Sequence, residues 1–323
     1  MGILRIVGRE APVAIGAGES LLAAALRAGL DLPHGCLAGV CGECRVRVVA
    51  GSAVGPEIDG GLLACRATAS EVTIALMPRP PAAPPPPPRR FESRVAAVTP
   101  LARGVVAVAI AAPSDGLAFL PGQYATLGFA GLPPRDFSLA SLPGEARLVF
   151  HVRDAGPGTA GAFCATVLSI GDPVTVEAPF GRAHVRPDHR GPVLLVAGGT
   201  GLGAMLAIAR SALSTATDRP VTLCAGARAE AELYGEADLA ALAARRPAFR
   251  YALALSDPEG ATGRPVGSAV DLALDRLAAV AGLKVYAAGP PGMVSALIRR
   301  LAAAGIDPAE IHADAFAPVT PPR

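Results

Sequence analysis

Apolar and polar positions follow two different patterns along most of the chain. Between residues 92 and 179, apolar strand segments succeed one another with few helical stretches, which predicts an antiparallel β-barrel. Further on, strand segments alternate with turns and helical segments, a pattern typical of a parallel sheet covered by helices. These later strand segments are residues 193–197, 221–227, 249–255 and 284–289.

The first 78 residues show a third pattern, that of a small domain with one sheet and one helix. A cysteine-rich loop separates the helix from the later strands. The predicted strands are residues 3–7, 12–15, 45–51 and 71–77, and the predicted helix is 21–30. The fold class is therefore multidomain, with α+β and α/β units in one chain.

A proline-rich segment divides this first domain from the rest of the chain. Seven of the 32 prolines lie within the twelve residues 79–90. Because proline fixes φ and lacks an N–H donor, we expect an extended spacer here, with a ligand for a signalling domain as the alternative. The predicted units are residues 1–78, the spacer 79–90, a barrel at 91–186 and an α/β domain at 187–323.

The charge composition narrows the function classes. The chain carries 29 basic and 27 acidic residues, and its formal net charge of +2 argues against nucleic-acid binding. Glycines interrupt every apolar stretch of membrane length, and the charged opening residues are not typical of a signal peptide. We therefore expect a cytoplasmic protein without a membrane partner, in which clustered cysteines indicate a metal before a disulfide.

Four cysteines lie close together in the first domain. Cys36, Cys41 and Cys44 have C-x4-C-x2-C spacing, and Cys65 follows after a gap of twenty residues. This is the spacing of plant-type [2Fe–2S] proteins. Zinc is the alternative, but structural zinc sites usually use two matched cysteine pairs. The spacing therefore predicts that these four thiolates hold a [2Fe–2S] cluster.

With this cluster, the chain resembles the three-domain ferredoxin–flavin–nicotinamide reductase components of bacterial ring-hydroxylating oxygenases, in particular the naphthalene dioxygenase reductase type. The resemblance covers essentially all 323 residues and rests on the cysteine spacing and on the motifs that follow. It implies a plant-type ferredoxin domain of β-grasp fold, an antiparallel FAD-binding barrel and a parallel-sheet NAD(P)H-binding domain.

The family's flavin motif, R-x-[YF]-S, is matched by Arg135, Phe137 and Ser138, with phenylalanine where tyrosine is commoner. The planar fork of an arginine suits a pyrophosphate. A serine hydroxyl can donate to a flavin nitrogen, and a flat aromatic ring can pack against the flavin. The resemblance therefore assigns these three residues to FAD.

A second flavin segment follows about twenty residues later. His151 and Arg153 end a predicted strand, and a glycine-rich turn then opens a helix. Free amide groups at such a turn bind phosphate, so Gly158, Thr159 and Ala160 are candidates for the FAD pyrophosphate. An ordinary helix capped by Thr159 is the alternative.

The nicotinamide half opens with a glycine turn between an apolar strand and a helix. Gly199, Thr200 and Gly201 begin a G-x-G-x-x-A pattern and are expected to bind the dinucleotide. Arg228 closes the next strand, where an arginine can accept a 2′-phosphate. The resemblance favours NADH and leaves NADPH open, and a solvent-exposed strand cap is the alternative role of Arg228.

Residues 286–293 resemble the family's Y-x-C-G-P-P-x-M signature, so Gly289 and Pro290 are assigned to the nicotinamide. Ala288 stands where the family usually has cysteine, which predicts slower or looser hydride transfer. The C-terminal ADAF motif resembles that of naphthalene-type reductases, and Phe316 is expected to face the flavin, as is Ser138. An ordinary core position is the alternative for Phe316.

The resemblance implies an NADH-dependent reductase that passes electrons through FAD and the [2Fe–2S] cluster to a Rieske-type ferredoxin or to the terminal oxygenase. No acid or base is assigned, since hydride transfer needs none. Two alternatives stay open: a reductase of the same build that serves a monooxygenase or a deoxysugar dehydratase, and a redox-sensing protein without hydride transfer. A monomer is expected.

Overall fold

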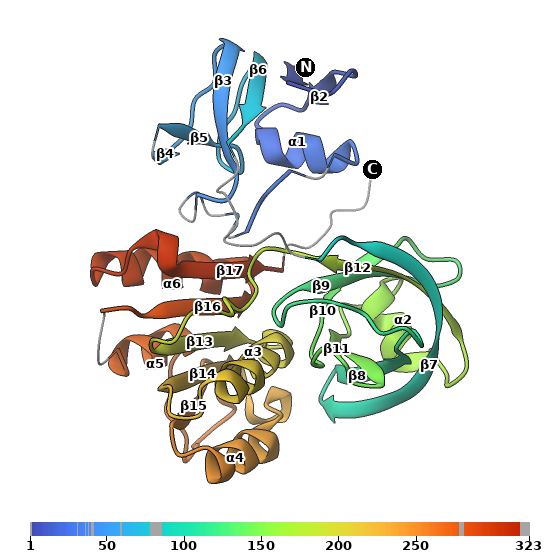
Figure 1. Ribbon diagram of the computed structural model, residues 1–323, viewed down its shortest axis with the longest axis vertical. Coiled ribbons are helices and arrows are strands. Elements are labelled where there is room, and N and C mark those ends of the chain that lie inside the picture. Colours follow the sequence, from blue (N-terminus) through green and yellow to red (C-terminus); the bar gives the residue numbers. More distant parts are fainter. Residues whose placement is uncertain are drawn as a thin grey trace.

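A computed structural model of the chain contains three sheets, each belonging to one of three domains that follow one another in sequence (Figure 1). The structure describes residues 2–30, 32–35, 37, 39, 42–58, 60–77, 86–277 and 281–316. No helix within these residues is long and apolar enough to cross a membrane.

The first domain is a mixed sheet with one helix packed on it, the β-grasp arrangement. Its strand order is β2-β1-β6-β3-β5-β4, with β1 parallel to β6. Ser20 caps the helix by accepting a hydrogen bond from the Ala23 amide at 3.2 Å. Its elements are β1 (Gly2–Ile6), β2 (Val13–Ile15), α1 (Leu21–Arg27), β3 (Arg45–Gly51), β4 (Glu57–Ile58), β5 (Gly61–Leu63) and β6 (Glu71–Leu76).

The second domain is an antiparallel barrel with strand order β10-β9-β12-β7-β8-β11. A bridge between Leu139 and Phe150 joins the two ends of this order and closes the barrel. Alternate strand residues point inward and form an apolar core that includes Phe119, Phe129 and Phe150. The elements are β7 (Arg89–Ala102), β8 (Val105–Ala111), β9 (Tyr124–Gly128), β10 (Arg135–Ser138), β11 (Arg147–Arg153), α2 (Ala160–Thr166) and β12 (Pro173–Phe180).

The third domain is a five-stranded parallel sheet of order β15-β14-β13-β16-β17 with helices on both faces. Its apolar strands are buried on both sides, in two separate core clusters. Its elements are β13 (Val193–Gly198), α3 (Gly201–Thr215), β14 (Val221–Ala227), α4 (Glu236–Arg245), β15 (Phe249–Leu255), α5 (Ala269–Asp275), β16 (Lys284–Gly289), α6 (Pro291–Ala303) and β17 (Ile311–Ala315), with short 3₁₀ turns at Glu230–Glu232 and Pro308–Glu310.

The fold class is as predicted, and several details differ. Strand β7 begins at Arg89, so the last two residues of the predicted spacer pair with β12. They can do so because they are arginines, which keep the N–H donor that proline lacks. Helix α5 ends at Asp275, although the apolar pattern predicts a helical segment over residues 270–280. Strands β4, β5 and β17 are not among the predicted ones. Spacer residues 79–85 lie outside the described residues.

The ferredoxin-like domain lies against the junction between the barrel and the parallel sheet (Figure 1). Residues of strand β17 and of the connector from β12 to β13, residues 181–192, line a cavity together with residues 32–35 of this domain. Helix α3 lies between the sheet and the barrel. An ion pair from Arg210 to Glu145 also crosses the barrel–sheet boundary.

Candidate functional site

Two of the four predicted cluster ligands belong to the described residues, and both are buried. Cys44 immediately precedes β3 and Cys65 follows β5; their exposed fractions are 4% and 9%. The Ala64 amide donates to the Cys44 carbonyl at 3.0 Å, so the backbones of the two cysteine segments are joined. Cys36 and Cys41 lie outside the described residues.

The loop that carries the cysteines has an unusual backbone. Leu37, Gly39 and Gly42 have φ values of 53°, 77° and 74°. Such positive φ values turn the chain sharply, and glycine adopts them at little cost. A Cβ on Gly39 would lie 2.7 Å from the Cγ of Arg66, so the loop also passes close to the Cys65 segment. This tight turn and the two buried cysteines, Cys44 and Cys65, fit a [2Fe–2S] cluster.

The flavin motif meets the last strand of the parallel sheet. The Ser138 hydroxyl at the end of β10 donates to Oδ2 of Asp314 on β17 at 3.5 Å. Burial raises the pKa of the Asp314 carboxyl to about 6, while the nearby His34 opposes that rise. The pair can therefore hold a proton and exchange it near neutral pH, beside the expected flavin ring.

Asp314 is a site residue that the sequence did not single out as functional, although it lies within the ADAF motif. Its place depends on the register of strands that are far apart in sequence: Ala288 pairs with Ala197 on one side and with Asp314 on the other. The carboxyl ends of β13, β16 and β17 therefore lie side by side. Ligands of wound α/β sheets bind at these ends.

The other two residues of the flavin motif point to different surroundings. Phe137 packs against the barrel core. Arg135 lies at the start of β10, and its guanidinium donates to the carbonyl of Pro134 at 3.0 Å. No carboxylate of the described residues forms an ion pair with this guanidinium, which fits a residue that binds a pyrophosphate.

His151 connects the barrel to the nicotinamide domain. Its Nδ1 lies 3.1 Å from the Tyr234 hydroxyl, and burial lowers its pKa to about 4, so the ring is neutral at physiological pH. A Cβ on Gly203 would lie 2.7 Å from the same Nδ1. Helix α3 can approach the barrel only because position 203 has no side chain.

The predicted phosphate turn before α2 has the backbone of a capped helix. Thr159 caps α2, since its Oγ1 accepts a hydrogen bond from the Ala162 amide at 3.1 Å and donates to the Gly156 carbonyl at 2.7 Å. Gly158 has a φ of 78°. The structure brings Gly158, Thr159 and Ala160 together at one helix start, as both the phosphate and the ordinary-cap interpretations require.

The glycine turn after β13 is packed tightly against the end of β16. A Cβ on Gly201 would lie 2.1 Å from the Ala288 carbonyl oxygen, and one on Gly198 would lie 2.7 Å from Met293. Gly199 has a φ of 55°. No side chain among the described residues caps α3 at Thr200, so its positive end is open to an anion. These features fit a dinucleotide turn.

The signature after β16 closes the same edge of the sheet. Gly289 has a φ of 150° and leads into Pro290, which precedes the first residue of α6. The Phe316 amide donates to the Gly289 carbonyl at 3.0 Å, and the Phe316 side chain packs against the core that includes Leu202. Phe316 therefore lies at the junction between the two assigned segments.

Arg228 lies at the end of β14, as predicted, but a buried carboxylate engages it. Its Nη2 is 2.9 Å from Glu232, whose side chain is 7% exposed, and Arg153 of the barrel lies 3.4 Å from the same residue. Burial opposes ionisation of Glu232, yet the two arginines together lower its pKa. Sequence reasoning missed Glu232, because a single glutamate in a short turn carries no motif.

Buried histidines predict how stability depends on pH. Burial lowers the pKa of both His151 and His184 to about 4. Unfolding exposes both imidazole rings. In the unfolded chain they therefore take up protons near the ordinary histidine pKa of about 6.5, whereas in the folded chain they stay neutral at that pH. Stability that is present above that pH is therefore lost as pH falls toward 4, by about 2 kcal/mol per histidine near pH 5. We expect Tm to decrease over this range, and less steeply in His184→Gln; equal slopes would contradict the assignment.

Two family models match the chain. A 2Fe-2S iron–sulfur cluster binding domain matches residues 4–70, and an oxidoreductase NAD-binding domain matches residues 195–298. The first contains Cys44 and Cys65, and the second contains the turn at Gly199 and the signature at Gly289.

Known proteins match the chain over nearly its whole length. The chain is 35% identical over 312 residues to the ferredoxin–NAD(P)+ reductase component of naphthalene 1,2-dioxygenase/salicylate 5-hydroxylase systems from Ralstonia sp., covering 93% of this chain and 94% of the relative. It is 31% identical to the naphthalene 1,2-dioxygenase reductase component of Pseudomonas putida, with 94% of each covered. It is also 32% identical to the reductase subunit of an Amycolatopsis aromatic O-demethylase, covering 94% of this chain and 95% of the relative.

Solved structures are similar over nearly the full length. A cytochrome P450 reductase from Amycolatopsis has a TM-score of 0.72 at 30% identity, with 99% of this chain and 100% of that chain covered. A ferredoxin reductase in carbazole 1,9a-dioxygenase has a TM-score of 0.68 at 27% identity, with 98% of each covered. The chain belongs to the family of ferredoxin–NAD(P)+ reductase components of oxygenase systems, and it is an electron-transfer oxidoreductase that uses a [2Fe–2S] cluster, FAD and NAD(P)H.

Proposed function

We propose that the chain is the NADH-dependent reductase of an aromatic-ring oxygenase and delivers electrons to a Rieske-type ferredoxin or to the oxygenase itself. The similarity to reductase components of naphthalene dioxygenase systems supports this acceptor class. We also propose that it acts in the cytoplasm and as a monomer. The reductase names carried by the relatives favour electron transfer driven by hydride over a redox-sensing role.

One observation carries the proposal: the three units meet at Asp314. This residue accepts the hydrogen bond from Ser138 of the barrel and lies on the last strand of the parallel sheet. It also lines a cavity of about 80 Å³ together with His34 and Gly35, which immediately precede the cysteine loop. Flavin, nicotinamide and cluster segments therefore converge on one point, as a short electron path requires.

The proposal gives each assigned residue a task. Arg135, Phe137 and Ser138 hold the flavin with His151, Arg153, Gly158, Thr159 and Ala160; Gly199, Thr200, Gly201, Arg228, Gly289 and Pro290 hold the nicotinamide dinucleotide; and Phe316 shields the flavin. Cys36, Cys41, Cys44 and Cys65 are the cluster ligands. When bound, FAD takes a hydride from NADH and releases single electrons to the cluster. The chain itself sets the distances and excludes water, and Asp314 holds a proton beside Ser138.

The Arg228–Glu232 pair supports NADH as the preferred reductant. A 2′-phosphate on NADPH would have to compete with Glu232 for the guanidinium of Arg228 and would bring its own negative charge near that carboxylate. NADH has no such phosphate and meets no such repulsion.

Glu232→Gln should therefore shift the preference toward NADPH. Removing the carboxylate charge leaves both arginines without their anion, and the ratio of kcat/KM for NADPH to that for NADH should rise roughly tenfold, the equivalent of about 1.4 kcal/mol. The matched control is Glu259→Gln, which removes a largely exposed carboxylate 3.6 Å from Arg103. An unchanged ratio in Glu232→Gln would contradict the assignment.

The acceptor is tested directly with purified proteins. NADH and the reductase are mixed without oxygen with a Rieske-type ferredoxin, a ring-hydroxylating oxygenase or a monooxygenase component, and the absorbance of each acceptor is followed. Fast reduction of one of the first two supports the proposal. Reduction of the monooxygenase component alone would refute it.

A further inference from the structure

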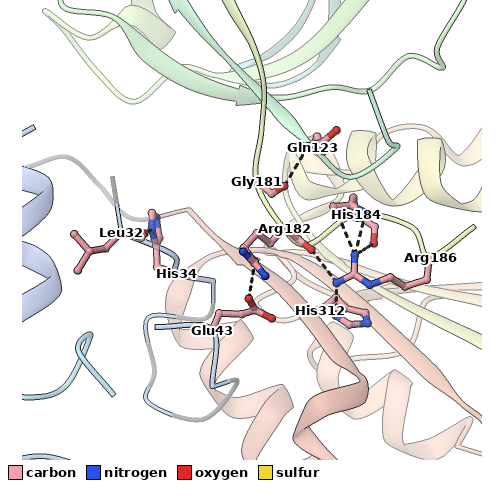
Figure 2. Close-up of polar contacts among 9 residues, drawn as sticks. All are labelled: Leu32, His34, Glu43, Gln123, Gly181, Arg182, His184, Arg186 and His312. Atoms are coloured by element: carbon pink, nitrogen blue, oxygen red, sulfur yellow. Dashed lines mark hydrogen bonds and ion pairs between the residues drawn. The ribbon is translucent and has the colours of Figure 1, made fainter. Parts of the chain in front are cut away.

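The ferredoxin domain contacts the rest of the chain through the cysteine loop, the segment 36–44. Glu43 precedes the cluster ligand Cys44, and its carboxylate lies 2.8 Å from the Nε of Arg182 (Figure 2). The side chain of Glu43 is 12% exposed and that of Arg182 is 32% exposed. This is the ion pair, among those of the described residues, that joins the first domain to the other two.

Arg182 occupies a rigid position. It lies just beyond β12, in the connector between the barrel and the parallel sheet, and its carbonyl accepts a hydrogen bond from Arg186 at 3.2 Å. The guanidinium of Arg186 also lies 3.2 Å from Nδ1 of His312 on β17 (Figure 2). The Arg186 amide in turn donates to the Tyr286 hydroxyl on β16 at 3.0 Å. Arg182 is thus fixed to the strands that form the nicotinamide and flavin edge.

Other residues of the first domain also lie against the other two domains. Leu37, which lies next to Cys36 in the cysteine loop, packs against the core of the parallel sheet. Leu32 and His34 line the cavity that Tyr124 and Asp314 also line. Among the described residues, this contact contains a single partly buried charge pair, Glu43 and Arg182.

A charge pair between two domains contributes to the specificity of their arrangement. A partly buried ion pair fixes register and suppresses wrong arrangements, and removing one partner leaves the other charge poorly solvated. One position of the ferredoxin domain places the cysteine loop beside Asp314 and Ser138, and the ion pair selects that position.

We propose that Glu43 and Arg182 are positioning residues, which dock the cysteine loop on the flavin edge and thereby set the rate at which electrons reach the cluster. This inference deepens the proposed electron path and is independent of which acceptor receives the electrons. A one-electron transfer from reduced flavin to the oxidised cluster breaks no bond in the protein, so its rate depends on distance and orientation, which this docking fixes.

The test uses full-length Arg182→Gln, since Arg182 lies outside the cluster loop. The control is Arg190→Gln, an exposed arginine in the same connector. Small-angle X-ray scattering on the oxidised protein, without NADH, should show a larger radius of gyration for Arg182→Gln than for wild type and Arg190→Gln. The wild-type value should approach that of the variant as ionic strength rises, because salt screens the pair.

Rapid mixing with NADH provides the second readout. In Arg182→Gln, flavin reduction should keep its wild-type rate while cluster reduction slows by roughly tenfold or more. The charge swap Arg182→Glu with Glu43→Arg should restore the compact scattering profile. Scattering and cluster reduction indistinguishable from wild type in Arg182→Gln, or a loss of flavin reduction as large as the loss of cluster reduction, would overturn the proposal.

Discussion

Replacing Cys44 with serine should abolish electron delivery to the acceptor while leaving reduction of the flavin intact. Cys44 is 4% exposed and lies directly before β3, so water cannot readily reach this position to replace its sulfur as a ligand. A [2Fe–2S] cluster needs four cysteine thiolates, and serine at one of them should remove it or leave it unstable. We expect acceptor reduction to fall by roughly 100-fold or more.

Absorbance spectra and iron content report the loss of the cluster, and rapid mixing with NADH reports the flavin. The flavin should respond normally, because the ferredoxin domain has a core separate from those of the other two domains. Cys164→Ala is the control: Cys164 is also buried, but it lies in α2 of the barrel. Full acceptor reduction by Cys44→Ser would refute the role of the cluster in the path.

Replacing Gly201 with alanine should impair the use of NADH. The new Cβ would lie 2.1 Å from the carbonyl oxygen of Ala288, and a backbone atom at the end of a central strand cannot move aside cheaply. The turn must therefore shift away from the edge where the nicotinamide is expected. The strain is of the order of 1–3 kcal/mol, and we expect KM for NADH to rise roughly 10- to 100-fold.

The variant must be shown to fold, so its FAD and iron contents are measured first and should match wild type. The control is Gly128→Ala in β9, where a Cβ would make only an ordinary 3.5 Å contact with Thr175. Unchanged kcat/KM for NADH in a Gly201→Ala protein that retains both cofactors would show that the turn does not bind the dinucleotide.

Four of the five strands of the parallel sheet could be predicted from the sequence almost to the residue. Strands β14, β15 and β16 have the predicted bounds, because strands buried on both faces are continuous apolar runs that glycines and prolines delimit. Strand β17 could not be predicted in this way. It contains His312 and Asp314 within five residues, so its pattern resembles that of a loop, and only pairing with β16 makes it a strand.

The same distinction applies to the residues of the candidate site: some could be predicted from the sequence, and others could not. Local motifs indicated the cysteines, the glycine turn and the flavin serine, because each motif performs its chemistry within a few consecutive residues. Asp314, Glu232 and Glu43 gain their roles from partners far away in sequence, namely Ser138, Arg153 and Arg182. Contacts between domains leave no periodic signal in a single sequence, so only the structure could bring them together.

The central claim is an electron path from NADH through the flavin to the cluster, and anaerobic stopped-flow mixing with NADH tests it most directly. The flavin absorbance should bleach first, and the iron–sulfur absorbance should decrease afterwards, in the order that the meeting of the three domains at Asp314 requires. A flavin that responds to neither NADH nor NADPH would contradict the account, and so would a cluster that loses its absorbance before the flavin does.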